Sequence, residues 1–319
     1  MFSFVFRRFL SLIPLLLGIS LISFLLLELA PGDYFTQLQQ DPTISRETLA
    51  RLRQEFALDK PVLVQYGHWL ANICRGNFGR SIAYRIPVMD LLLPRLFNTI
   101  TLSAAALMLS WLIAIPFGVF AARKPGGWFD RSLGFVSFAG MAVPEFMLAF
   151  LAIYLAAKTG AFPVGGVGGY DLEGWEAVSD YMTHLLPPTI VLAIGSVAYI
   201  QRLMRSNVIE ELGRDYVRTA RAKGLPASRV LWRHAVPNAL NPMITLFGMQ
   251  LSAVASGAAL VENVMAWPGL GRLLLEATLS QDLYVVMASL LFGSLLLVAG
   301  NLLSDIALAV LDPRIRRAG

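Results

Sequence analysis

Long apolar blocks constrain this chain more than any other feature. Six blocks of about 20 residues or more lie at approximately 9–29, 99–122, 133–157, 185–203, 243–261 and 285–311. A helix of that length can cross the roughly 30 Å of hydrocarbon in a bilayer. The chain is 56% hydrophobic and only 15% charged, whereas soluble domains average about 25% charged residues. The sequence therefore predicts an all-α membrane protein with six transmembrane helices.

The distribution of lysine and arginine predicts the orientation of these helices. The segment between the second and third blocks carries Arg123, Lys124 and Arg131, and eight basic residues lie between positions 202 and 233. The segments after the third and fifth blocks carry one each, Lys158 and Arg272. Because positive residues in short loops mark the cytoplasmic side, both termini and the segment 204–242 are predicted to be cytoplasmic. The net charge of +5 then requires no nucleic-acid partner.

The same pattern divides the chain into four parts. Residues 1–30 form an N-terminal membrane anchor, because their apolar run is longer than the 7–15 residues of a signal-peptide core. Residues 31–98 form a long external loop with helices of its own, one capped by Ser45 and one ending at Gly76. Residues 99–311 form a five-helix core, and residues 312–319 form a cytoplasmic tail.

Several kinds of catalytic and metal site have no counterpart in the sequence. There is no glycine-rich phosphate loop, no zinc-binding H-E-x-x-H and no nucleophile elbow. The histidines, His68, His184 and His234, fall in three separate segments, and Cys74 is the single cysteine. We therefore expect no catalytic residue, bound cofactor, metal site or intrachain disulfide in this chain, and an intramembrane enzyme is disfavoured.

A few polar residues lie inside the apolar blocks, where burial in lipid is costly and function is the first hypothesis. Glu145 follows Pro144, which is expected to bend the third helix. Glu145 either lines a translocation path and meets a cationic group, or is a structural carboxyl group that is protonated, paired or near the membrane interface. Asn301, Ser304 and Asp305 share one face of the last block, and hydrogen bonding between helices is the favoured interpretation.

The predicted cytoplasmic segment "DYVRTARAKGLPASRVLWRHAVPNALNP" contains its own helix signals. Asp215 can cap a helix over 216–223, and Gly224 suits the left-handed position that ends it. Pro226 suits the first turn of a second helix, which Pro237 and Pro242 are expected to end. The sequence thus predicts a helix, a glycine turn and a second helix at the membrane surface.

Two interpretations of this segment remain open. Each helix has an apolar face, and the residues that form the two faces are Tyr216, Val217, Ala220, Val230, Leu231 and Ala235. Such helices could lie on anionic lipid, at about 1 kcal/mol per basic residue. A strip of small residues favours close docking of a soluble protein instead; its members are Thr219, Ala220, Ala222 and Gly224.

The segment resembles the coupling loop of ABC importer permeases, which carries the "EAA" motif, E-A-A-x-x-x-G followed by a proline. Arg218, Thr219 and Ala220 occupy the E-A-A places, Gly224 the glycine and Pro237 the proline. The leading acid of the motif is replaced by Arg218, so no role of that acid carries over. The resemblance implies that this loop docks into a cytoplasmic ATPase.

Four further stretches are similar to the dipeptide/oligopeptide/nickel permease family, of the first permease subunit type: "RRFLSLIPLLLGISLISFLLLELAPGD", "ALDKPVLVQYGHWLANICRGNFGRSI", "VENVMAWPGLGRLLLEA" and "NLLSDIALAVLDPRIR". The resemblance implies a type I (MetI-like) permease fold in a bacterial inner membrane. It implies three kinds of partner besides membrane lipid: a second homologous permease, two ATPases that bind the ATP, and an external binding protein. The residues expected to couple to the ATPase are Tyr216, Arg218, Thr219, Ala220, Lys223, Gly224, His234 and Pro237.

Two points stay open: the identity of the substrate and the role of one turn. Peptides are the expected cargo, with nickel chelates, glutathione or sugars as alternatives. A stand-alone channel or secondary carrier would leave the basic loop without a purpose. The turn at Trp267, Pro268 and Gly269 either covers the pore or anchors an interfacial tryptophan.

Overall fold

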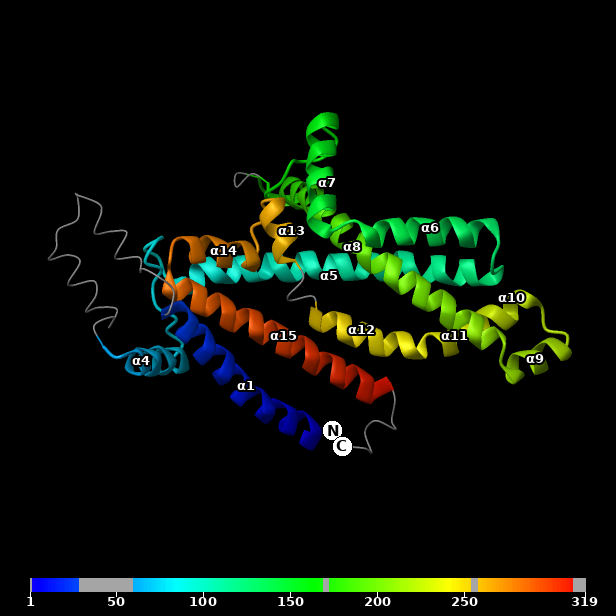
Figure 1. Cartoon of the computed structure of the whole chain (residues 1–319), viewed down its shortest axis with the longest axis horizontal. Coiled ribbons are helices and arrows are strands. Elements are labelled where there is room, and N and C mark those ends of the chain that lie inside the picture. The colour runs from blue at the N-terminus through cyan, green and yellow to red at the C-terminus, as the bar shows by residue number, and fades with distance from the viewer. Residues whose placement is uncertain (1, 29–59, 169–171, 254–257, 312–319) are drawn as a thin grey trace. The chain divides into compact units, whose positions relative to one another are not determined.

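The computed structural model describes residues 2–28, 60–168, 172–253 and 258–311. This part of the chain is built from α-helices (Figure 1) and contains no β-strand, only an isolated bridge between Arg80 and Pro87. The predicted all-helical class is therefore confirmed for the described residues. The predicted helix capped by Ser45 lies outside them.

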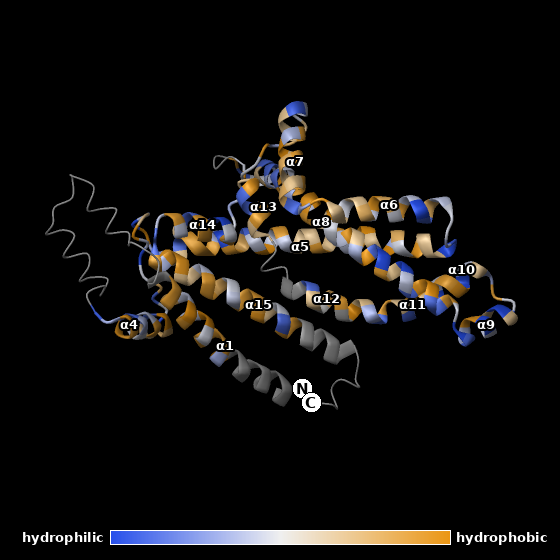
Figure 2. Cartoon of the chain, in the orientation of Figure 1, coloured by the Kyte–Doolittle hydropathy of each residue, from blue (hydrophilic) through white to orange (hydrophobic). Residues whose placement is uncertain are grey.

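Three of the described helices are long and apolar enough to cross a membrane. They are α5 (Val88–Arg123), α8 (Gly174–Leu212) and the Leu283–Leu303 part of α15 (Leu283–Leu311). Apolar residues predominate along α5 and α15 (Figure 2). The pair α6 (Trp128–Ala142) and α7 (Glu145–Thr159) counts as a fourth candidate if the two are one broken span. In α1 (Phe2–Glu28), the apolar stretch Ile13–Leu26 is shorter.

The structure changes two of the predicted spans. The third is not a single bent helix, because α6 and α7 meet at 99° and Pro144 is the residue that precedes α7. Proline disfavours helical backbone in the residue before it, which explains why α6 ends at Ala142. The fourth helix begins at Gly174, eleven residues before the predicted start of the span at Leu185. The predicted fifth span begins in α12 (Asn241–Ala253) and continues into residues outside the described part.

The chain divides into two compact units, and the first contains residues up to 99 together with 268–298. In it, α14 (Leu270–Leu279) packs on the beginnings of α5 and α15 through Val88, Leu92, Leu273 and Val285. The helix α4 (Val62–Cys74) packs against α1 and α15 through a second buried cluster, Phe24, Trp69 and Met287. Gly76 follows α4 with a φ of +78°, so the predicted end of this helix is confirmed.

A buried carboxylate joins two distant segments of this unit. Asp282 is fully buried at the start of α15 and accepts hydrogen bonds from the Ser81 hydroxyl at 2.5 Å and the Ala83 amide at 3.0 Å. It also accepts one from the amide of Val285 at 3.3 Å. A buried charge is tolerated when hydrogen bonds compensate its desolvation. Asp282 therefore holds the loop before α5 on the first turn of α15.

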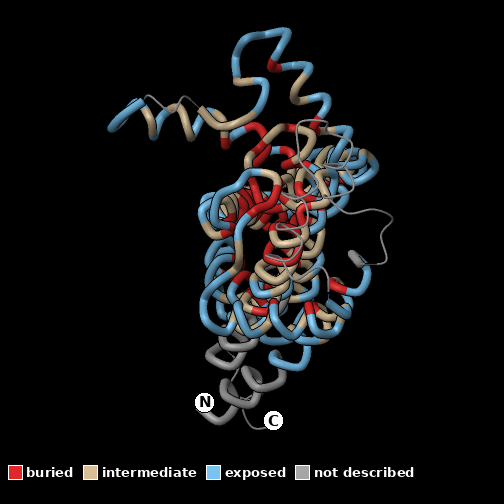
Figure 3. Tube along the Cα trace, turned by 90° about the vertical axis from the view of Figure 1, so that its left-hand side faces the viewer, coloured by how far each residue is buried: buried red, intermediate tan, exposed pale blue. Residues whose placement is uncertain are grey.

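The second unit contains residues 100–267 and those from 299 onward. Its centre is the crossing of α5 and α8, where a Cβ on Gly118 would lie 2.7 Å from the carbonyl oxygen of Gln201. Only glycine permits this approach. The helix α6 lies along α8, joined by an ion pair between Asp130 and Arg205 and by a 3.0 Å hydrogen bond from Ser137 to Gln201. Buried residues gather where helices meet, and exposed residues cover their outer sides (Figure 3).

Trp267 packs inside this unit and does not anchor an exposed turn. Its side chain is 1% exposed, and its ring meets that of Tyr181 edge to face with centroids 5.5 Å apart. Leu102, Leu185 and Ala258 complete the cluster. The interpretation of Trp267 as an interfacial anchor is therefore wrong, because an anchor would leave its ring at the membrane surface. The preceding helix, α13 (Ala259–Val264), packs on α7 and α8 through Val261 and Ala149.

Candidate functional site

The connection between α8 and α12 begins with the helix α9 (Asp215–Ala222). The predicted cap is wrong by one residue, since Arg214 occupies the N-cap position and makes no side-chain capping hydrogen bond. Asp215 lies in the first turn, where a carboxylate is favourable to the helix dipole. Its contact with Arg218, at 3.3 Å, is solvent-exposed and contributes little to stability.

A glycine turn ends α9 as the sequence predicts. Gly224 has a φ of +79°, a conformation that costs other residues steric strain. The Gly224 amide donates to the carbonyl of Arg221 at 2.9 Å, and the Leu225 amide donates to that of Ala220 at 3.4 Å. These two hydrogen bonds form a Schellman motif. The direction of the chain after α9 is therefore set by backbone hydrogen bonds as well as by packing.

The second helix of the connection has three consecutive parts: α10 (Ala227–Val230), the π-helical η1 (Leu231–Ala235) and α11 (Val236–Ala239). Pro226 precedes the helix as its N-cap and does not lie in its first turn as predicted. Pro237 lies inside the run, so the prediction that it ends the helix is wrong. Pro242 lies in α12. The break between the two helices falls at Leu240, between α11 and α12.

A local change of register explains how Pro237 is accommodated. Proline lacks an amide hydrogen, and its ring collides with the carbonyl four residues earlier. In η1 the Val236 amide bonds to the carbonyl of Leu231, five residues back. Such a single wide turn is typical of π-bulges, which occur frequently at functional sites.

The inner face of the connection packs on the ends of α5 and α8. Val217, Ala220 and Val230 form a buried cluster with Leu212 and Leu225. The inward residues of the second helix join a larger core that includes Val119, Met204 and Val208; they are Leu231, Ala235, Val236 and Ala239. The predicted apolar faces are confirmed for both helices, with the exception of Tyr216, which is 39% exposed.

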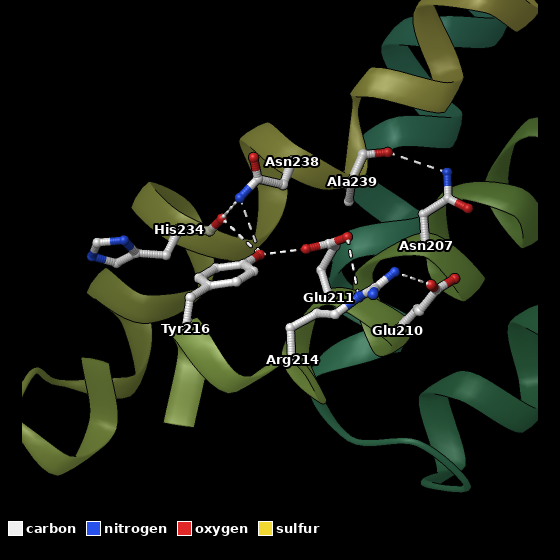
Figure 4. A network of polar contacts seen from close by, with 8 residues as sticks. All are labelled: Asn207, Glu210, Glu211, Arg214, Tyr216, His234, Asn238 and Ala239. Atoms are coloured by element: carbon white, nitrogen blue, oxygen red, sulfur yellow. Dashed lines mark hydrogen bonds and ion pairs between the residues drawn. The ribbon is translucent and has the colours of Figure 1, made fainter. Parts of the chain in front are cut away.

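A polar network replaces apolar packing at Tyr216 (Figure 4). The Tyr216 hydroxyl donates a hydrogen bond to the carboxylate of Glu211 at the end of α8. The Asn238 amide group donates to the Tyr216 hydroxyl at 3.1 Å and to the His234 carbonyl at 2.9 Å. Glu211 also lies 3.9 Å from Arg214. One tyrosine hydroxyl thus connects three successive helical segments.

Burial of the ring raises the pKa of Tyr216 above its ordinary value of 10.0, and the hydrogen bond with Glu211 raises this pKa further. The phenol is therefore neutral at physiological pH and keeps its proton available to Glu211. A further hydrogen bond, from the Asn207 amide group to the carbonyl of Ala239 at 3.1 Å, joins α8 to the end of the second helix. These contacts favour movement of α8, α9 and α11 as one body.

The outer face of the connection is basic, and around Gly224 it is also lightly built, whereas the second helix exposes Trp232. Among the described residues from 216 to 237, Arg218, Arg221, Lys223, Arg229 and Arg233 are exposed, and Asp215 next to them is already paired with Arg218. Three small residues, Thr219, Ala222 and Gly224, are exposed among these charges. Ala220 belongs to the inner face instead, at 6% exposure. We call the exposed residues of 216–237 the coupling surface.

The predicted coupling residues meet in this one region. Tyr216, Arg218, Thr219, Lys223, Gly224 and Pro237 are exposed, and His234 is half-buried. His234 contributes its backbone carbonyl to the network, whereas its imidazole points away from Tyr216 (Figure 4). Ala220 is buried, so its small side chain serves packing within the chain and is not free to contact a partner.

The residues predicted to line a path lie elsewhere in the second unit. Pro144 and Glu145 are at the break between α6 and α7, and the Glu145 side chain is exposed beside it. Of the residues predicted to hydrogen-bond between helices, Asn301 is exposed on α15, and the side chains of Ser304 and Asp305 are not among the described ones. The described residues contain no cluster of three side chains suited to hold a metal ion.

Sequence reasoning missed the residues that hold the connection in place. They are Asn207, Glu210, Glu211, Arg214 and Asn238. Spacing alone could have suggested the 2.5 Å contact between Arg214 and Glu210, since opposite charges four residues apart meet on a helix. No comparable sequence signal joins Glu211 to Tyr216 or Tyr216 to Asn238.

Comparisons with known protein families match the two parts of the chain to the same kind of transport protein. The family model described as "Binding-protein-dependent transport system inner membrane component" matches residues 114–317. A second model, "Binding-prot-dependent transport system membrane comp, N-term", matches residues 1–103. Together the two matches extend over nearly the whole chain.

Individual relatives agree with these matches. The oligopeptide transport system permease protein AppB of Bacillus subtilis is 40% identical over 317 residues, which cover 99% of each chain. The dipeptide transport system permease protein DppB of Escherichia coli is 35% identical over 336 aligned positions, again covering 99% of each. Among solved structures, an inward-facing MetNI methionine ABC transporter is 17% identical. It covers 69% of this chain and 97% of that one, with a TM-score of 0.50, a similarity in fold alone.

Proposed function

Because the chain belongs to the family of binding-protein-dependent transport system inner membrane components, we propose that it forms half of the pore of an ATP-driven peptide importer. The matched relatives are permeases of oligopeptide and dipeptide systems at 35–40% identity along their whole length, which favours di- and oligopeptides as the cargo. The chain itself is a permease component and not an enzyme. ATP is bound and hydrolysed by its partners.

The proposed assembly contains this chain, one homologous permease, two cytoplasmic ATPases and an external binding protein. The proposed topology has six spans with both termini in the cytoplasm, which puts the coupling surface on the side where ATP is available. Among the eight basic residues from 202 to 233, those on the outer face suit an acidic cleft on the ATPase. The residue proposed to line the translocation path is Glu145, next to the break at Pro144.

One observation carries the proposal for the coupling surface. An exposed face that combines basic and small side chains is held to α8 by packing, a Schellman turn and the Tyr216 network. A lever needs this stiffness, because movement of the ATPase must be transmitted and not absorbed. An amphipathic pair that rests on lipid needs the charge but no such network.

The single cysteine provides a test of the topology. Cys74 is exposed at the end of α4, in the segment proposed to be external. A membrane-impermeant maleimide should therefore label Cys74 in intact cells or spheroplasts. In a Cys74→Ser background, Arg221→Cys should be labelled only after the membrane is permeabilised. Labelling of Arg221→Cys in sealed cells would refute the proposed orientation.

The partners are tested by purification of the tagged chain from its native membrane in mild detergent, with mass spectrometry of the proteins that accompany it. A second permease and an ATPase with a phosphate-binding loop should co-purify. Recovery of the chain alone, or bound only to itself, in several detergents would contradict the proposal and favour a stand-alone channel or carrier. A co-purified binding protein can then be screened with di- and oligopeptides, nickel chelates, glutathione and sugars.

Docking at the coupling surface is tested by Gly224→Trp, with Gly126→Trp as a matched control. Both glycines have left-handed backbone, with φ of +79° and +73°, and neither has an atom within 4 Å of an added Cβ. The two variants therefore share strain and bulk, but Gly126 lies outside the coupling surface. Gly224→Trp should insert normally and abolish transport, whereas Gly126→Trp should transport. Equal transport by both variants with normal ATPase association would reject the docking role.

A further inference from the structure

A pocket with aromatic walls and two cations in its lining lies where α5 and α6 meet at a short turn in the second unit (Figure 1). Its volume is about 610 Å³. We call it the turn pocket, and the residues that line it are Pro116, Phe117, Phe120, Arg123, Lys124 and Phe129. The three phenylalanine side chains are each between 41% and 44% exposed, so the pocket is open to an occupant.

Contacts between rings hold the apolar walls of the turn pocket in place. Phe117 of α5 stacks on Phe129 of α6, with centroids 6.1 Å apart and ring planes at 13° to each other. Phe120 meets Trp232 of η1 edge to face at 6.2 Å. Because each contact joins two different helices, the rings are ordered by the chain itself, and the aromatic surface exists before anything binds to it.

The two cations of the turn pocket have no acidic partner within the described part of the chain. Neither Arg123 nor Lys124 takes part in an ion pair there. Asp130, in the first turn of α6, pairs with Arg205 instead. The Arg123 guanidinium lies 5.9 Å from the centroid of the Phe120 ring, a cation–π contact that does not neutralise its charge. The lining therefore presents two positive charges to an anion.

The lining of the turn pocket changes from apolar to cationic along α5. Phe117 comes first, Phe120 follows one turn later, and Arg123 and Lys124 come last. About 9 Å of helix separates Phe117 from Arg123, at 1.5 Å per residue. Since α5 is a candidate membrane span whose apolar block ends at Ala122, the phenylalanines lie at the depth of hydrocarbon and the cations at its edge.

We infer that the turn pocket binds an anionic phospholipid of the leaflet on the side of the coupling surface. An acyl chain lies against Phe117 and Phe129, and the phosphate lies between Arg123 and Lys124. A phospholipid has the same order of apolar and charged parts as the lining, and basic pockets between membrane helices suit anionic head groups. Depth favours a lipid over the soluble ATPase, because Phe117 lies inside the apolar block, where a soluble protein does not reach.

The inference rests on the proposed membrane topology and not on the proposed docking of an ATPase. Loss of the lipid is therefore not expected to release the ATPase, and Gly224→Trp is expected to keep the lipid. The topology has its own test in the labelling of Cys74 and Arg221→Cys. Failure of the lipid site can thus be distinguished from failure of the proposed function.

The charges are tested with the complete chain and the subunits that co-purify with it, titrated with phosphatidylglycerol or with phosphatidylcholine of identical acyl chains and followed by native mass spectrometry. The unchanged protein should bind phosphatidylglycerol more tightly. Arg123→Gln and Lys124→Gln should each weaken phosphatidylglycerol binding by about fivefold, the contribution of one basic residue near an anionic surface, and leave phosphatidylcholine binding unchanged. The matched control is Arg202→Gln, because Arg202 also lies over a phenylalanine ring, 4.8 Å from the centroid of Phe138, but does not line the pocket.

A second variant tests the aromatic wall. Phe129→Ala should weaken binding of both lipids, whereas Phe135→Ala, which removes an exposed ring of the same helix outside the pocket, should not. Equal affinity of the unchanged protein for the two lipids, or equal effects of Arg123→Gln and Arg202→Gln, would overturn the inference. Release of a protein subunit by Phe129→Ala, with lipid binding unchanged, would also overturn it and assign the pocket to a subunit interface.

Discussion

Removal of the Tyr216 hydroxyl should have a measurable effect on the local stability of α9. Tyr216→Phe removes the hydrogen bond to Glu211 and the one received from Asn238 at 3.1 Å. Asn238 retains the His234 carbonyl at 2.9 Å, and Glu211 retains Arg214 at 3.9 Å. No buried polar atom is left without a partner, so the loss should be close to the net worth of an exposed hydrogen bond, about 1 kcal/mol.

The expected consequence is local opening of α9 and not loss of the fold. A loss of about 1 kcal/mol corresponds to about a fivefold increase in the open fraction. Amide hydrogen exchange of the assembled transporter should therefore show about fivefold less protection in α9. The matched control is Tyr84→Phe, because Tyr84 also directs its hydroxyl at a carboxylate, Glu276 at 3.5 Å, but lies in the other unit. This control should leave protection of α9 unchanged.

The same network has a defined pH dependence. The pKa of Tyr216 is raised in the folded chain by burial and by Glu211. A raised pKa means that the contribution to stability is complete below the unfolded value of about 10 and is lost as the pH rises through the higher folded value. Protection of α9 should therefore stay constant from pH 6 to 9. Unchanged protection in Tyr216→Phe, or a loss that spreads evenly over α8, would refute the reasoning.

Three further substitutions test the packing of the two units through thermal unfolding of the purified protein. Asp130→Ala leaves Arg205 unpaired and should lower the free energy of unfolding by about 2–3 kcal/mol. This is less than the roughly 3–5 kcal/mol expected for a wholly buried pair, because Arg205 is 33% exposed. A change below about 0.5 kcal/mol would show that the pair is solvated. Trp267→Ala should lower the free energy of unfolding by about 3–5 kcal/mol, whereas removal of an interfacial tryptophan would lower it far less. Asp282→Ala leaves the Ser81 hydroxyl without its buried acceptor, and the melting temperature should fall; an unchanged value would contradict the joining role of Asp282.

The membrane helices could be predicted because their signal is local. Apolar length alone located α5, α8 and the described part of α15, although α5 and α8 each begin eleven residues before the apolar blocks predicted at 99 and 185. The break at Pro144 was predicted only as a bend, because a proline constrains the residue before it but does not determine the angle at which the next helix starts. The tertiary environment determined the rest: Trp267 has the sequence context of an exposed turn and is buried against Tyr181.

In the connection between α8 and α12 the sequence predicted which residues face inward but not which contacts hold the two helices together. The spacings of Val217 and Ala220 and of Leu231 and Ala235 are helical, so the sequence alone indicates the inner face of each helix. The link from Glu211 through Tyr216 to Asn238 depends on the path of the chain through the Gly224 turn. Tyr216 and Asn238 are 22 residues apart, and no sequence pattern could reveal their contact.

The structure around Pro237 differs from what the sequence predicted. The sequence suggested a helix terminator, yet the helix continues through it at the cost of one π-turn, in which the Val236 amide reaches back to Leu231. That turn shifts every later residue by one position relative to a regular α-helix. Beyond this turn, Asn238 donates hydrogen bonds to both the Tyr216 hydroxyl and the His234 carbonyl. The π-turn therefore lets the helix continue past Pro237 to Asn238, whose hydrogen bond with Tyr216 joins the second helix to α9, as the proposed lever between an ATPase and a pore requires.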